Sequence, residues 1–108
     1  MYGTISRGRV KKDRIRELMA LGKEWDDRGR KNAVGYINSE LLWCDEGGGR
    51  ICMIIHFTSK EAYRKNAESP EQDAFYRRLR ACLEEDLEWT DGTFSQWDSP
   101  YAQVPSFD

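Results

Sequence analysis

The chain of 108 residues is long enough for one domain with a hydrophobic core and no disulfide support. Its net charge of −2 argues against binding to nucleic acid, although the first third is basic and the last third acidic. No run approaches the ~20 apolar residues of a membrane span, and the start lacks the pattern of a secretory signal. We therefore expect a cytoplasmic protein without nucleic-acid or membrane partners.

Hydrophobic periodicity predicts strands and helices in alternating order. The glycine-rich run 45–49 predicts a hairpin turn between two strands. In chain order we expect a strand over 2–10, a helix over 12–28, strands over 33–44 and 50–57, a helix in two parts over 60–67 and from 69 onward, a strand over 87–97 and a tail over 98–108.

Two serines mark the starts of the two parts of the second helical region. Ser59 follows an apolar strand, and Glu61 then falls in the first turn, where the helix dipole favours a carboxylate. Ser69 precedes Pro70 and is followed three residues later by Gln72, which is the pattern of a capping box with proline in the first turn.

The order β-α-β-β-α-β predicts an α+β fold, the ferredoxin-like arrangement, for residues 1–97 as a single domain. Four antiparallel strands would carry both helices on one face. The opposite face would expose apolar and aromatic side chains, and exposed surface of that kind normally marks an interface. We therefore expect a homodimer, sheet against sheet, that encloses a barrel-like cavity.

The third strand and its exit, residues 54–63 (IIHFTSKEAY), together with the element order over 2–97, resemble the dimeric α/β-barrel proteins, specifically antibiotic-biosynthesis-monooxygenase-like domains. The resemblance implies a small-molecule ligand. Members of this superfamily include cofactor-free quinone-forming monooxygenases, haem-degrading enzymes, isomerases and proteins without an assigned activity.

Haem degradation in this superfamily implies an Asn on the first strand and a Trp and a His on the second helix. This chain has Thr4 and Ser6 on the first strand, Asn66 at or near the Trp position, and Phe75 and Tyr76 in the His region. The three departures argue against haem. Three cysteines and one histidine without closely spaced ligand pairs also predict no metal site, so we expect no cofactor.

His56 is the only histidine and the best candidate for a catalytic group. Side-chain alternation places it with Cys52 and Ile54, opposite the more apolar side of its strand. If that apolar side packs on the helices, His56 points into the dimer cavity. A group that titrates near neutral pH suits a general base. The alternative is a structural histidine at the barrel interior or the interface.

Five further residues are candidates for ligand binding. Tyr36, Asn38 and Glu40 alternate along the second predicted strand and would line the same cavity. Tyr63 on the second helix and Trp89 on the last strand would add aromatic contacts. The alternatives are a solvent-facing strand for the first three and core packing for Tyr63.

These residues lead to two hypotheses on function. The first is a small-molecule-binding dimeric barrel that acts as a cofactor-independent monooxygenase on an aromatic or polyketide-like substrate, in which His56 takes a proton while Tyr36 and Asn38 orient an oxygen atom. The second is a non-catalytic ligand-binding or stress-associated dimer, because no nucleophile–base pair, pair of acids or metal cluster stands out in the sequence.

Overall fold

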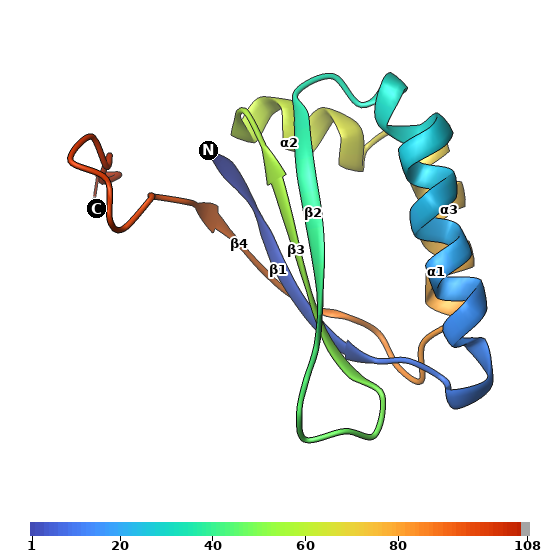
Figure 1. Ribbon diagram of the computed structural model, residues 1–108. Coiled ribbons are helices and arrows are strands. Elements are labelled where there is room, and N and C mark those ends of the chain that lie inside the picture. Colours follow the sequence, from blue (N-terminus) through green and yellow to red (C-terminus); the bar gives the residue numbers. More distant parts are fainter. Residues whose placement is uncertain (107–108) are drawn as a thin grey trace.

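The computed structural model describes residues 1–106, and the predicted tail residues 107 and 108 lie outside this part. A four-stranded antiparallel sheet in the order β2-β3-β1-β4 carries the helices on one face and leaves the other open (Figure 1). The ferredoxin-like prediction is confirmed. The elements are β1 (Tyr2–Arg9), η1 (Lys12–Arg14), α1 (Ile15–Glu24), η2 (Trp25–Gly29), η3 (Arg30–Asn32), β2 (Tyr36–Trp43), β3 (Arg50–Phe57), α2 (Lys60–Ala67), α3 (Pro70–Ala81) and β4 (Glu88–Thr93).

The sheet is amphipathic because side chains alternate along each strand. On β3, Ile51 and Phe57 are buried beneath the helices, and Cys52, Ile54 and His56 face the open side. The main core lies where α1, α3 and the end of β1 meet the sheet, and partly buried Leu41, Met53, Phe75 and Tyr76 pack against it. Its buried members are Val10, Leu18, Leu21, Ile51, Leu79, Cys82, Leu83 and Leu87.

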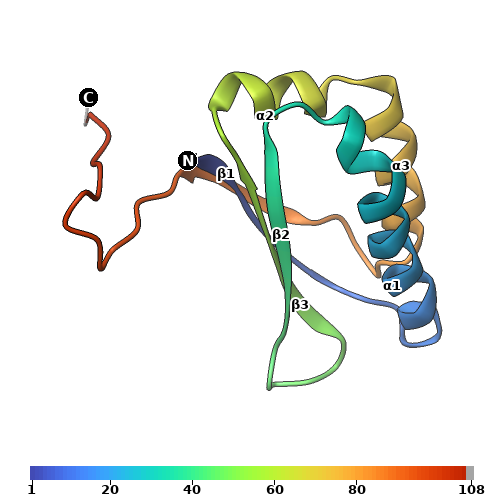
Figure 2. The same ribbon diagram turned by 45° about the horizontal axis from the view of Figure 1, so that its top comes forward.

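Both predicted helix starts are confirmed. The Ser59 hydroxyl accepts a hydrogen bond from the Ala62 amide at 3.1 Å, which caps α2. The Ser69 hydroxyl accepts one from the Gln72 amide at 3.1 Å, with Pro70 in the first turn of α3. The intervening break lets α3 turn away from α2 and run beside α1 (Figure 2).

The first helical region is less regular than the single helix predicted over 12–28. A 3-10 turn precedes α1, and the chain then widens into a π-helical turn, η2, before a second 3-10 turn. Within α1, Gly22 is exposed with open space around it, and its neighbour Leu21 is buried. No helix among residues 1–106 is long and apolar enough to cross a bilayer.

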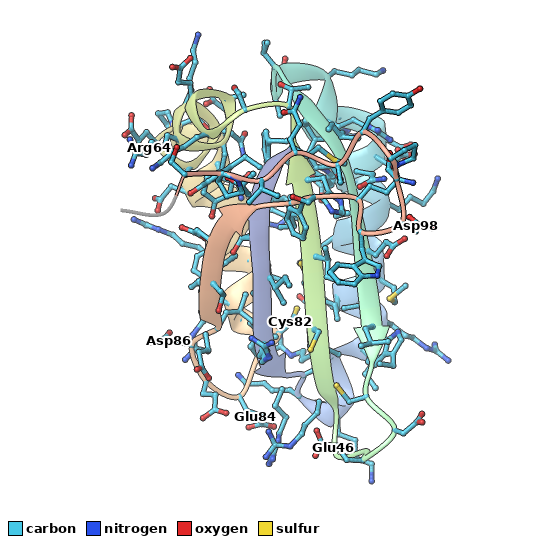
Figure 3. All side chains as sticks on the ribbon, turned by 90° about the vertical axis from the view of Figure 1, so that its left-hand side faces the viewer. Glu46, Arg64, Cys82, Glu84, Asp86 and Asp98 are labelled. Carbon is cyan, nitrogen blue, oxygen red and sulfur yellow. The ribbon has the colours of Figure 1, made fainter. Side chains whose placement is uncertain are left out.

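Two departures from regular pairing affect the faces of the sheet. The register of β2 against β3 shifts between Tyr36 and Asn38, so these two side chains point to opposite faces. Beyond β4, residues 94–106 cross in front of one end of the open face without forming a helix or strand (Figure 3). In this segment Trp97 is 95% exposed.

Candidate functional site

His56 belongs to a small polar and aromatic cluster on the open face of the sheet. Its Nδ1 lies 2.9 Å from Asn38 Oδ1, and the bond places the proton on Nδ1 because the amide oxygen only accepts. Phe94 packs against the imidazole with ring centroids 4.3 Å apart. Gly3 lies between the strands carrying these groups, where a Cβ would meet the Phe94 ring. The imidazole Nε2 is left to accept a proton.

Glu40 lies on the same face as His56, opposite Ile54 in the register. Apolar side chains share this face with Glu40 and His56: Ile5 and Ile54 are half-buried, and Leu42 is 55% exposed. Three of the six residues singled out from the sequence, His56, Asn38 and Glu40, therefore share the open face.

The other three lie on the helix-covered side, so they do not line one cavity with His56. Tyr36 packs between Trp25 and Phe57, and its predicted alternation with Asn38 was wrong because of the irregularity in β2. Tyr63 donates a hydrogen bond to Asp91 at 3.1 Å. Trp89 packs against Tyr76 of α3 at the edge of the sheet.

A pocket with a volume of about 350 Å³ lies on the helical side of the sheet. It opens where η2 and the following loop approach α2 and α3, an end that Figure 2 brings forward. This volume is within the range of small-molecule sites. Its lining includes Glu24, Trp25, Arg28, Gly29, Ala33, Val34, Lys65, Asn66, Gln72, Phe75 and Arg78.

Trp25 and Phe75 form an aromatic wall of this pocket, with ring centroids 5.4 Å apart. Trp25 is the first residue of the π-helical turn, and such turns are frequent at functional sites. Its ring lies directly over Gly29, where a Cβ would come within 2.8 Å of Cζ3. The absence of a side chain at Gly29 therefore sets the position of the indole. Tyr36 supports the ring from the sheet side at 5.3 Å.

Polar groups complete the pocket. Asn66 Nδ2 donates to Gln72 Oε1 at 3.4 Å. This bond leaves the amide oxygen of Asn66 and the NH₂ group of Gln72 for a ligand. Arg78 donates to both carboxylate oxygens of Glu24 at 2.9 and 2.7 Å and joins α3 to α1. This hydrogen bonding lowers the pKa of Glu24, so the carboxylate is engaged as an ion.

Solved structures with the same fold cover most of the chain. A cofactor-independent oxygenase, SnoaB from Streptomyces nogalater, superposes with a TM-score of 0.73 at 18% identity, over 88% of this chain and 93% of SnoaB. An antibiotic biosynthesis monooxygenase gives 0.69 at 14% identity, over 87% and 98%. A conserved protein from Methanosarcina mazei Go1 gives 0.72 at 18%, over 84% and 89%.

The fold is that of the antibiotic-biosynthesis-monooxygenase-like proteins. No family model and no curated protein matches the sequence. The predicted resemblance is thus confirmed for the fold, and identities this low carry no activity with them.

The pocket was not predicted from the sequence. Trp25 lies within the helix predicted over 12–28 and was not singled out, and Asn66 was named only as a departure from the haem-degrading pattern. Gln72 was seen as a helix-capping residue. The available signal was the break at Ser69–Pro70, because residues on either side of a bend between two helices lie near the same space. The described residues contain no cluster of three metal-ligating side chains.

Tyr63 makes the stability of the fold depend on pH in the alkaline range. Burial, assisted by the Asp91 carboxylate, raises the pKa of Tyr63 from 10.0 to about 12. A raised folded-state pKa stabilises the fold below pH 10, and this contribution is lost as pH rises toward 12. In chemical unfolding at stepped pH, Tyr63→Phe should lose less stability over this window than wild type. Tyr101→Phe, in the exposed segment, should follow wild type, and parallel curves for all three proteins would contradict the assignment.

Proposed function

We propose that this protein is a cofactor-independent monooxygenase that binds a planar aromatic or polyketide-like substrate in the helix-side pocket. The observation that carries the proposal is the pocket itself: an aromatic wall of Trp25 and Phe75 opposite the amides of Asn66 and Gln72. Support comes from the same fold in SnoaB, a cofactor-independent oxygenase. An aromatic substrate would stack on the wall and hydrogen bond to the amides.

The charges at the pocket favour a substrate that ionises. Arg28 and Lys65 line it, and within residues 1–106 neither makes a close ion pair with a carboxylate. A nearby cation lowers the pKa of an acidic hydroxyl group. The proposed substrate is therefore a phenol or enol with an adjacent reactive CH₂ group. Its anion would react with O₂, converting the CH₂ group to a carbonyl and releasing water, so the substrate supplies all the electrons.

His56 enters this proposal as a second location for the chemistry. It lies on the opposite face of the sheet from the pocket, so it cannot take a proton from a substrate bound in the pocket of its own chain. It could act as the base on a substrate held at the open face, where Asn38 fixes the tautomer and leaves Nε2 free. A reaction in the pocket and a reaction at the open face predict opposite effects of substituting Asn66 and His56 on the rate.

The test measures O₂ consumption and quinone formation with anthrone-like or hydroquinone substrates. Asn66→Leu should lower kcat/KM at least about tenfold, because the substrate loses its hydrogen bond to the Asn66 amide. His56→Ala should leave the rate unchanged. A rate lost in His56→Ala and retained in Asn66→Leu would overturn the pocket and place the reaction at the open face.

A second candidate is a non-catalytic ligand-binding or stress-associated protein. It is favoured by the shortage of a positioned general base: of the two carboxylates that line the pocket, Glu24 is held by Arg78 and Glu71 is exposed at the start of α3, and His56 lies elsewhere. Tight binding of the same compounds without O₂ consumption, lost in Asn66→Leu, would establish this candidate in place of the oxygenase.

We further propose a homodimer formed through the open face, because Ile5, Ile54 and Leu42 present apolar surface there. Sedimentation analysis should show a dimer at micromolar concentration. Ile5→Lys should dissociate it, and Met19→Lys, at an exposed position on α1, should not. A monomeric wild-type protein would exclude this assembly.

A further inference from the structure

Two of the three cysteines lie near one another on the open face, at the hairpin end of β2 and β3. The Cys44 amide donates to the Arg50 carbonyl at 3.0 Å, and Cys52 lies opposite Leu42. Cys44 and Cys52 therefore occupy diagonal positions on paired antiparallel strands, with both side chains on the same face. Diagonal neighbours on one face of such a pair lie close enough to interact.

We propose that Cys44 and Cys52 are an oxidation site that forms a reversible disulfide between β2 and β3. Both thiols are free and half-buried in the structure. In agreement with this proximity, the pKa of Cys44 is raised by burial first and by a hydrogen bond to the Cys52 thiol second.

The hairpin between the two cysteines can absorb the small adjustment that a disulfide requires. Gly47, Gly48 and Gly49 all have positive φ, at 76°, 68° and 78°. A Cβ at Gly47 or Gly48 would meet nothing within 4 Å, so the tip of the turn is open, whereas Gly49 is held against Val10 by a backbone hydrogen bond of 2.9 Å. The adjustment that brings the two Sγ atoms together therefore falls on the tip and on the Cys44 side of the hairpin.

The third cysteine provides an internal control. Cys82 is fully buried in the core beneath the helices, and its Sγ donates to the Arg78 carbonyl at 3.6 Å. It lies on the other side of the sheet from Cys44 and Cys52, so it cannot pair with them without unfolding.

The proposed oxidant is a low-molecular-weight disulfide. One cysteine thiolate attacks a sulfur of the oxidant, forming a mixed disulfide and releasing one thiol. The second cysteine thiolate then attacks the protein sulfur of the mixed disulfide, forming the Cys44–Cys52 bond and releasing the second thiol. Two protein thiols are oxidised and one oxidant disulfide is reduced.

The test treats the folded full chain with oxidised glutathione, blocks the remaining thiols and measures intact mass and non-reduced peptide maps. We expect a chain that has lost two hydrogens and gained one blocking group, on Cys82, with one Cys44–Cys52 peptide pair and recovery on reduction. Cys82→Ser should give the same bond, and Cys44→Ser and Cys52→Ser should give none within the chain. A bond to Cys82, a bond joining two chains, stable glutathione adducts on both cysteines, or no reaction would each overturn the proposal.

The bond would also change stability, because it joins the edge strand β2 to an inner strand and restricts the unfolded chain. The oxidised wild type should therefore melt at a higher temperature than the reduced form, and oxidised Cys44→Ser should not. The bond forms within one chain, so this test is independent of the proposed monooxygenase activity.

Discussion

Gly3→Ala should lower the free energy of unfolding by about 3 kcal/mol, because the new methyl group has no space on the open face of β1. A Cβ at this position would overlap the Ile55 backbone carbonyl and come within 3.2 Å of the Phe94 ring. Relief requires separation of β1 from β3, which are central in the sheet, or displacement of Phe94 from His56.

Gly92→Ala is the matched control, since Gly92 lies directly opposite Gly3 on β4 and has nothing within 4 Å of its Cβ position. It should change the unfolding free energy by less than about 0.5 kcal/mol. Urea unfolding of both variants and wild type measures the difference. Equal stability of the two variants would show that Gly3 is not confined as described.

Gly29→Ala should lower the free energy of unfolding by about 2 kcal/mol, because its methyl group would collide with the Trp25 indole. The backbone at Gly29 is helical, with φ −66° and ψ −44°, so alanine is not strained there. The cost arises because the methyl group must push the indole away from η2. Since Trp25 is a wall of the pocket, Gly29→Ala should also weaken binding of an anthrone-like compound.

Gly22→Ala is the corresponding control in α1. Gly22 is exposed with open space around it, so alanine should raise stability by about 1 kcal/mol through helix propensity alone. The two substitutions are chemically identical and lie within one continuous helical stretch. Thermal and urea unfolding that moved both variants in the same direction would refute the role of Gly29.

The elements that the sequence predicts well are those with local signals. Ser59 and Ser69 cap helices because their hydroxyl groups bond to amides only three residues away. The strand over 50–57 is apolar enough to be recognised without its neighbours. Side chains alternate between the two faces of a strand, so His56 points away from the face of Ile51 and Phe57, and its position on the open face could also be predicted.

The remaining features depend on contacts between distant segments. The shift in β2 has no local signature, and it separates Tyr36 from Asn38, which simple alternation joins. Thr4 and Ser6 are fully buried although both are polar, because their hydroxyl groups donate to the Thr90 and Met53 carbonyls of neighbouring strands. The pocket likewise forms between η2, α2 and α3, and periodicity within each element gives no information about such a junction.

The irregularity in β2 connects the two sides of the molecule mechanically. Tyr36 touches the Trp25 indole at the pocket, and two residues later Asn38 holds the His56 imidazole on the opposite face. Only Ile37 separates the residue that supports the pocket wall from the residue that orients the imidazole. The pocket and the open face are thus built on one short stretch of shared backbone.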